Sequence, residues 1–194
     1  MLSLTFDDGP DPVWTPAVLA ELARCGARAT FFVVVPRAAR RPGLVRRMLA
    51  EGHGVELHCW SHERHTRCVR RRVEDETDRA LATLAGMGVR PRLWRTPWGD
   101  RAPWTGEVAR ARGLTPVGWT ADTHDWRGDA APAMLAAVRP ALGPGGSVLM
   151  HDGLGPGALR ADCRETVRLV GPLCRLARDR GWRVGPMPAP GPAA

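Results

Sequence analysis

Short apolar runs alternate with helix-like segments along nearly the whole chain, and this alternation restricts the fold more than any other feature. The runs are rich in β-branched and aromatic residues, as ATFFVVV at residues 29–35 illustrates. Segments with helical periodicity, bounded by Pro or Gly, lie between them. Strands that alternate with helices pair in parallel, so we predict an α/β protein with a mostly parallel sheet.

The expected elements follow from apolar character, from helical spacing and from the residues at helix ends. Strands are expected at residues 2–9, 29–35, 54–60, 92–99, 114–122 and 147–153, with a short one near 182–187. Helices are expected at residues 15–26, 42–51, 69–87, 103–113, 132–142 and 161–180. Thr15 is predicted to cap the first helix.

Composition is typical of one globular domain with free thiols. The chain has 194 residues, 44% of them hydrophobic, which suffices for one sizeable core. We therefore predict a single domain over residues 1–186, followed by a Pro/Ala-rich tail at 187–194. Five cysteines without a C-x-x-C pair argue against a disulfide framework and against a four-cysteine zinc site.

Membranes and nucleic acids are not expected partners. ATFFVVV is far shorter than the roughly 20 residues of a membrane-spanning helix, and the N-terminus lacks the features of a signal peptide, so a cytoplasmic location is expected. The net charge of +8 rests on arginine alone, because the sequence contains no lysine. The arginine clusters are interleaved with acids on helical faces and accompany no nucleic-acid-binding motif. The oligomeric state does not follow from the sequence.

Polar residues capable of chemistry gather where the expected strands end. They are Asp7 and Asp8, His58 and His62, Arg95 with Pro97 and Trp98, Asp122 with Asp125 and Trp126, and His151. The carboxyl ends of parallel strands share one rim, where α/β folds build their active sites. We therefore expect these residues to meet in one site.

Two histidines four residues apart, His58 and His62, indicate a metal site. Neutral imidazoles and one carboxylate make a three-ligand set with an open position. Such a pair by itself is more often surface polarity or a satisfied core group, but the nearby DDG sequence favours the metal. Either Asp7 or Asp8 completes the set, and the other would accept a proton from water. The alternative for DDGPDP is an ordinary turn.

A third histidine, His151, is the candidate acid. It could protonate a leaving amine while Asp125 holds its ring in the useful tautomer. The alternative is a buried histidine that bonds to the backbone.

Taken in order, TFDDGP, H-x-x-x-H, R-x-P-W-G, D-x-x-D-W and L-x-H closely resemble the five motifs of the polysaccharide deacetylase superfamily, carbohydrate esterase family four. The resemblance spans residues 2 to about 185. It implies a distorted (β/α)7-type barrel and a divalent metal, zinc foremost, with cobalt or nickel as alternatives. The implied reaction is removal of an N-acetyl or other small N-acyl group from an amino sugar, as a small molecule or an oligosaccharide.

The resemblance also implies a role for each motif residue. The implied metal ligands are Asp8, His58 and His62; Asp7 is the implied base and His151 the acid. Arg95 would orient the site carboxylates, and Asp125 would tune His151. The implied substrate-binding residues are Trp98, whose backbone N–H would help form an oxyanion hole, Leu149 in the acetyl-methyl pocket, Trp126 in the groove wall, and Pro97.

Two departures from the family pattern affect the substrate and the metal. Cys59 stands where Ser or Thr normally follows the first motif histidine, and a thiol is a softer donor and a weaker hydrogen-bond partner. The first motif also begins close to Met1 rather than after a leader. This favours a cytosolic enzyme for a small N-acylated amino sugar or a specialised-metabolite intermediate over a cell-wall enzyme.

Three alternatives compete with deacetylation. Deformylases and imidases of the same superfamily share its metal and fold. A non-haem iron oxygenase could use His58, His62 and Asp8 as its facial triad. A binding protein could retain the fold without activity. Hydrolysis accounts for more residues, since it also uses the base Asp7 and the acid His151.

Overall fold

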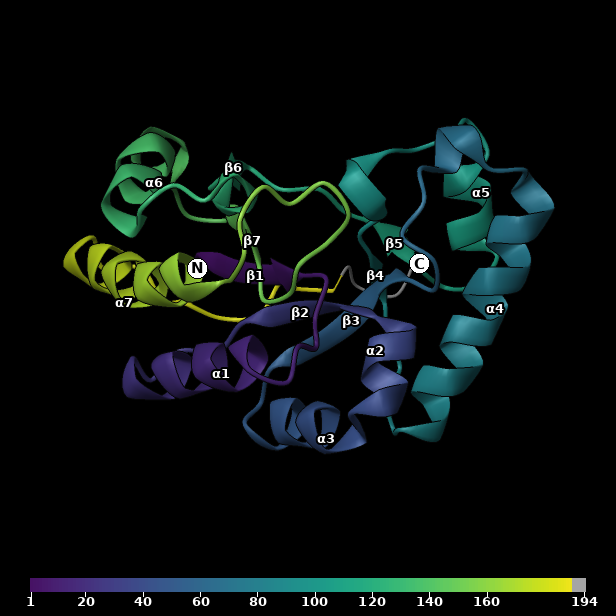
Figure 1. Cartoon of the computed structure of the whole chain (residues 1–194), viewed down its shortest axis with the longest axis horizontal. Helices are drawn as coiled ribbons and strands as arrows, with labels where there is room; N and C mark the ends of the chain where they lie inside the picture. Colours follow the sequence, from purple (N-terminus) through teal and green to yellow (C-terminus); the bar gives the residue numbers. More distant parts are fainter. Residues whose placement is uncertain (190–194) are drawn as a thin grey trace.

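The computed structural model describes residues 1–189, and a single parallel sheet organises them (Figure 1). Within this part of the chain, seven strands pair in the order β5-β4-β3-β2-β1-β7-β6, and every neighbouring pair is parallel. The strands are β1 (Ser3–Asp7), β2 (Thr30–Val34), β3 (Gly54–Cys59), β4 (Leu93–Trp94), β5 (Thr115–Pro116), β6 (Ala121–Asp122) and β7 (Ser147–His151). The predicted α/β fold is confirmed.

Helices lie around the outside of this sheet, with α6, α7 and α1 along the left of the view and α4 and α5 along the right (Figure 1). The α-helices are α1 (Trp14–Arg24), α2 (Val35–Arg40), α3 (Pro42–Ala50), α4 (Arg70–Gly86), α5 (Thr105–Arg110), α6 (Ala131–Val138) and α7 (Arg164–Asp179). Short 3-10 helices are η1 (His65–Arg67), η2 (Pro97–Gly99), η3 (Asp125–Arg127) and η4 (Arg139–Ala141).

The two faces of the sheet carry different side chains, because successive residues of a strand point to opposite sides. Leu4 and Phe6 of β1 belong to the hydrophobic core, and the Phe6 ring stacks on Phe31 at 5.2 Å between centroids. Thr5 and Asp7, which alternate with them, both bond to one guanidinium nitrogen of Arg95 on the other face. On this second face, β1 therefore presents polar side chains, and Asp7 among them lines the site.

The sheet is curled, as the short connection between β5 and β6 demonstrates. β5 and β6 lie at opposite edges, yet only residues 117–120 connect them. That connection reaches at most about 17 Å, whereas the edge strands of a flat sheet of this width would stand about 29 Å apart. Val117 N–H donates to Trp94 O and Thr120 N–H to Ser147 O, at 2.9 and 3.0 Å. The segment therefore closes the barrel across its open side.

This closure corrects two strand predictions. Residues 114–122 form two short strands on opposite edges rather than one strand, because the chain leaves the sheet between Val117 and Thr120 to cross the opening. The strand expected at 92–99 ends at Trp94. Beyond it, Pro97 begins a 3-10 turn in which Trp98 has a positive φ of 55°.

Helix boundaries differ in three places. Thr15 is not the cap of α1: the helix begins after Val13, and the Asp11 carboxylate accepts the N–H groups of Val13 and Trp14 at 2.8 and 2.9 Å. The expected strand at 29–35 ends at Val34, and an additional helix, α2, begins at once. The last helix starts at Arg164 rather than at residue 161, so the loop that precedes it extends over residues 152–163.

The C-terminal segment pairs less than predicted. The strand expected near 182–187 is reduced to a single bridge between Leu2 and Val184. Met187, the first residue of the predicted tail, donates its N–H to Thr30 Oγ1 at 2.8 Å, and tail residues 190–194 lie outside the described part. No helix within residues 1–189 combines the length and apolar character needed to cross a membrane.

Candidate metal centre and active-site cavity

A cavity of about 400 Å³ opens at the carboxyl ends of the strands. It brings together eight of the predicted site residues: Asp7, Asp8, His58, His62, Trp98, Trp126, Leu149 and His151. Arg95, Pro97 and Asp125 do not line it and lie buried behind its wall. The shared rim of a parallel sheet thus collects side chains from distant parts of the chain.

Three side chains form a ligand set in this cavity. His62 Nε2 and His58 Nε2 lie 3.1 and 3.4 Å from Asp8 Oδ1, and the three ligand atoms are all within 4.8 Å of one another. His58 Nδ1 lies 2.6 Å from the Arg95 carbonyl oxygen, to which it donates its proton. The Nε2 lone pair of neutral His58 therefore points at the shared centre.

A divalent cation fits this donor set. Asp8 Oδ1 is buried and has no hydrogen-bond donor within residues 1–189, although it faces two imidazole nitrogens. A buried carboxylate oxygen without a partner is costly, and a cation between the three lone pairs would satisfy it. Two nitrogens and one oxygen also leave further coordination positions open, as catalytic sites require.

The local charges support an ionised aspartate. Burial by itself raises the pKa of Asp8, but His58 and His62 outweigh it and hold that pKa well below its usual range. Burial likewise lowers the pKa of His58, but the neighbouring Asp8 and Asp7 carboxylates outweigh it and raise that pKa. Asp8 is therefore available as an anionic ligand, and a metal would compete with a proton for His58.

The backbone at Asp8 is held in an unusual conformation. Its φ of 71° lies in the left-handed region, which costs a non-glycine residue about 1–2 kcal/mol. Arg37 of α2 stabilises it by donating from Nη1 to Asp8 O at 2.8 Å and from Nη2 to Leu154 O at 2.9 Å. Sequence reasoning missed Arg37, because α2 itself was not predicted.

Asp7, the neighbour of the ligand, bonds to Arg95. Arg95 Nη1 donates to Asp7 Oδ1 at 2.9 Å and to Thr5 Oγ1 at 2.7 Å, while Nη2 donates to Gly118 O at 2.9 Å. The guanidinium is fully buried and lies over the Phe32 ring at 4.1 Å. Arg95 thus holds one oxygen of Asp7, a residue that also lines the cavity.

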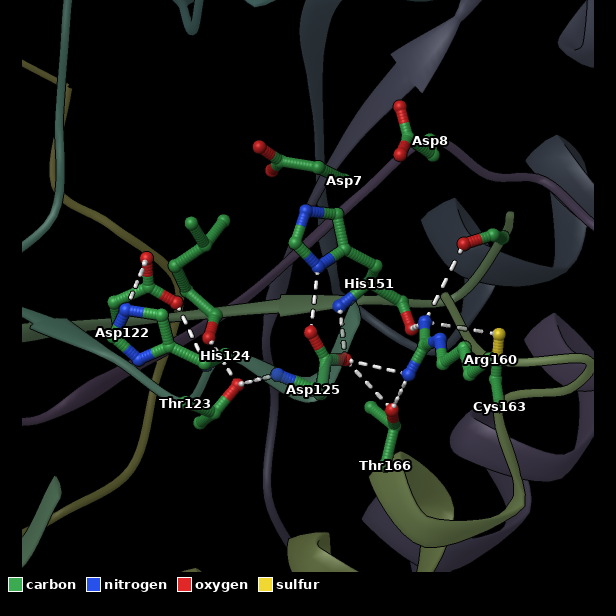
Figure 2. Close-up of polar contacts among 12 residues, drawn as sticks. Asp7, Asp8, Asp122, Thr123, His124, Asp125, His151, Arg160, Cys163 and Thr166 are labelled. Carbon is green, nitrogen blue, oxygen red and sulfur yellow. Dashed lines mark hydrogen bonds and ion pairs between the residues drawn. The ribbon is translucent and has the colours of Figure 1, made fainter. Parts of the chain in front are cut away.

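His151 stands beside Asp7, because the two residues are register partners on β7 and β1. His151 Nδ1 contacts Asp125 Oδ1 at 2.7 Å, and the far edge of the ring points toward Asp7 (Figure 2). Burial alone lowers the pKa of His151, but the Asp125 carboxylate outweighs it and raises that pKa to about 9. His151 is consequently protonated at neutral pH, as a general acid must be.

The second oxygen of Asp125 is held by Arg160, which sequence reasoning also missed. Arg160 Nη1 lies 2.9 Å from Asp125 Oδ2 and also bonds to Thr166 Oγ1, while Nη2 donates to His151 O at 3.0 Å (Figure 2). Burial raises the pKa of Asp125, but His151 and Arg160 outweigh it and lower that pKa to about 2. No local pattern marks Arg160, because it lies in a loop that the sequence assigns partly to a helix.

The family of the chain follows from comparison with known proteins. Residues 1–117 match the family model described as Polysaccharide deacetylase. The chain belongs to the polysaccharide deacetylase family. This confirms the family that the five motifs indicated.

Individual members of the family are similar to this chain over nearly its full length. The chain is 38% identical over 196 residues to the chitooligosaccharide deacetylase of Bradyrhizobium sp. (strain ANU 289), covering 95% of this chain and 88% of the relative. The Bc1960 peptidoglycan N-acetylglucosamine deacetylase superposes with a TM-score of 0.89 at 26% identity, over 96% and 86% of the two chains. The family 4 carbohydrate esterase from Streptomyces lividans gives 0.85 at 31% identity, over 95% and 91%.

Trp98, Trp119 and Trp126 give the cavity wall its aromatic surface. Trp98 is 40% exposed, and its ring meets His62 edge to face at 4.3 Å between centroids. Trp126 also lines the cavity, as does Leu149, which comes from β7. Asp122, which the sequence places in the same motif as Asp125, also lines it. Pro97 is buried and starts the turn that carries Trp98.

Cys59, the departure from the family pattern, faces away from the ligand set. It follows His58 on β3, so its side chain points to the other face of the sheet. There it lines a separate small cavity with Leu57 and Trp60. Burial raises the pKa of this thiol well above its usual value, which keeps it neutral. Among the described residues, Cys59 is therefore not part of the metal set.

Proposed function

We propose that this protein is a metal-dependent hydrolase that removes the N-acetyl group, or another small N-acyl group, from an amino sugar. The observation that carries the proposal is the convergence of the Asp8–His58–His62 set with Asp7 and His151 in one cavity. Relatives named chitooligosaccharide deacetylase and peptidoglycan N-acetylglucosamine deacetylase support the same reaction class.

Asp8, His58 and His62 would hold the divalent metal that the family generally uses. When bound, the metal supplies a Lewis acid that acidifies water and polarises a carbonyl. Zinc suits two imidazoles and a carboxylate, and cobalt or nickel are the alternatives. Asp7 accepts the proton of the attacking water, and Arg95 keeps its carboxylate oriented for this step.

Bond cleavage then requires an acid on the nitrogen side. His151 donates its proton to the amide nitrogen as the carbon–nitrogen bond breaks, so that the amine leaves uncharged. Asp125 positions the ring by holding Nδ1. The products are a carboxylate, acetate for an acetyl substrate, and the free amino sugar; the water oxygen enters the carboxylate.

The substrate-binding roles rest on the cavity wall. Leu149 offers an apolar surface for the acetyl methyl group, and Trp126 provides a ring for a sugar face. The Trp98 backbone, placed by Pro97 and by its positive φ, provides an N–H for the oxyanion that develops on the carbonyl oxygen. These assignments, and residues 1–186 as the catalytic domain, are part of the proposal.

Metal-dependent acyl release tests this proposal. N-acetylated and N-formylated amino sugars, chitooligosaccharides and small imides would be offered to chelated protein and to protein reloaded with zinc, cobalt or nickel. We expect acetate release only after reloading, and loss of release in His58→Ala and in Asp7→Asn. The Asp7→Asn variant should still bind the metal, which separates the base from the ligands. Retained activity in Asp7→Asn would disprove the base assignment.

The same experiment decides between the alternatives. Formate release or imide opening in preference to acetate release would assign the protein to the deformylases or imidases. Oxygen consumption with added iron, without acyl release, would favour the oxygenase. The cytoplasmic location remains a prediction from the sequence, which cell fractionation would check.

A further inference from the structure

Arg64, at the cavity wall, has no ion-pair partner among the described residues. Arg64 lies between β3 and η1 in the chain and lines the cavity together with His62. Its guanidinium lies over the Trp98 ring, 4.5 Å from the centroid. Within residues 1–189, its side chain forms no hydrogen bond and no ion pair. Its five N–H donors are therefore available to a molecule in the cavity.

The nearby acids already have other partners. The Asp100 carboxylate accepts both the N–H and the hydroxyl of Thr66, at 2.8 and 2.9 Å. Glu63 accepts from Arg72 at 2.6 Å. Arg64 acts on Asp100 only at longer range, beyond ion-pair distance. The protein thus holds the Arg64 side chain by stacking on Trp98 rather than by neutralising it.

The other charges around the cavity are compensated or lie elsewhere. Arg160 and the protonated His151, which also line it, are both bonded to Asp125. Asp7 is paired with Arg95, and Asp8 belongs to the metal set. Asp122 extends from β6, at the sheet edge remote from β3. Among the described residues that line the cavity, Arg64 is consequently the cation without a bonded acidic partner.

We infer that the substrate is an N-acyl amino sugar that carries an anionic group, a carboxylate or a phosphate, and that Arg64 binds this group. The inference rests on the proposed function and names its substrate class. A guanidinium presents paired donors that match either anion. Because stacking on Trp98 already restricts the Arg64 side chain, Arg64 loses less rotamer freedom when the anion binds. Bound in this way, the anionic group would also set which end of the sugar enters the cavity.

Matched neutral and anionic substrates test the inference on zinc-loaded protein. The probes are N-acetylglucosamine, N-acetylglucosamine 6-phosphate and N-acetylmuramic acid, each offered alone and as one unit of a trisaccharide. We expect a higher kcat/KM for an anionic probe than for its neutral counterpart. In Arg64→Gln this anionic-to-neutral ratio should fall about tenfold or more, and Arg64→Glu should lower it further. The phosphate and carboxylate probes identify which anion is preferred.

Arg127→Gln is the matched control. Arg127 is exposed and also stacks on a tryptophan, Trp126, at 5.1 Å, but it does not line the cavity. The Arg127→Gln substitution removes the same charge as Arg64→Gln. The anionic-to-neutral ratio of kcat/KM should therefore stay within about twofold of wild type if the preference depends on local contact with Arg64 rather than on net charge.

The outcomes separate the two proposals. Acyl release from neutral and anionic probes at equal rates, or a ratio that Arg64→Gln leaves unchanged, would overturn the role of Arg64 while the deacetylase function stands. Equal losses in Arg64→Gln and Arg127→Gln would overturn it as well, since they would show a general charge effect. No acyl release from any probe would overturn the proposed function together with this inference.

Discussion

Asp125 carries a cation on each of its oxygens, His151 on Oδ1 and Arg160 on Oδ2. The two contacts act on His151 in opposite directions. The carboxylate raises the pKa of His151, whereas Arg160 withdraws part of that negative charge and so limits the rise. A general acid needs this balance, because it must be protonated before the reaction and must still release its proton.

Asp125→Asn should move the alkaline limb of kcat/KM to lower pH. The protonated His151 is lost as pH rises through its folded pKa of about 9. Without the carboxylate that pKa falls toward the ordinary value of about 6.5, so activity at pH about 8 should drop tenfold or more. The pH–rate profile of acyl release measures the shift. Asp129→Asn, an exposed change in the same loop, should leave the limb in place.

Arg160→Gln should move the same limb the other way. With Arg160 gone, the Asp125 charge acts on His151 alone, so the pKa of His151 rises further and the acid becomes weaker. We expect a several-fold lower rate near neutral pH. Arg164→Gln, an exposed arginine at the start of α7, is the control. If Asp125→Asn and Arg160→Gln shifted the alkaline limb in the same direction, the opposing roles of Asp125 and Arg160 would be contradicted.

At the scale of elements, the metal set depends on two loops that follow neighbouring strands. Asp8 follows β1, and residues 152–163 follow β7, which pairs with β1. Arg37 joins the loops by bonding to Asp8 O and Leu154 O. Gly155 approaches so closely that an added Cβ would overlap Asp8 Oδ2. The position of one ligand is thus set by a loop distant in sequence.

Gly155→Ala should weaken metal binding. The added methyl group overlaps the Asp8 carboxylate, which must turn away from His58 and His62. When the groups that orient a metal ligand are disturbed, metal affinity falls by about tenfold or more. Zinc titration by calorimetry measures the loss. Gly106→Ala on α5, where a Cβ meets open space, should bind zinc like wild type, and equal affinity of both variants would refute the role of Gly155.

For the whole molecule, the curled sheet determines which groups are shut away from water. Asp152 is completely buried next to β7 and accepts a hydrogen bond from Thr15 of α1, while its Oδ1 has no donor within residues 1–189. Burial, opposed by the Thr15 hydrogen bond, raises the pKa of Asp152 to about 7. The folded protein therefore prefers the protonated carboxyl, and its stability depends on pH.

Asp152→Asn should stabilise the protein more at pH about 8 than at pH about 5. The folded pKa of about 7 exceeds the unfolded value of about 3.9, so the stabilisation from protonated Asp152 is complete only below the unfolded value and is lost as pH rises from there through 7. Asparagine cannot ionise, and the free energy of unfolding at high pH should rise by a few kcal/mol. Urea unfolding of metal-free protein at both pH values measures this. An equal gain at both pH values, or none, would count against it; Asp129→Asn is the exposed control.

The sequence by itself determined the strands that can be buried and the residues that gather at their ends. Apolar runs such as 29–35 and the helix from Pro42 are local patterns, which need no knowledge of distant residues. The same is true of Asp7, Asp8, His58, His62 and His151, because a strand end is a local property and parallel strands share their ends.

Only the tertiary structure decided the rest. The split of residues 114–122 depends on barrel closure, and the contacts of Arg37, Arg95 and Arg160 join segments far apart in the chain. Such an arginine contacts a partner that is distant in sequence, so the contact produces no periodic pattern in the sequence. The orientation of Cys59 away from the metal set and the free charge of Arg64 likewise depend on which groups the fold places nearby.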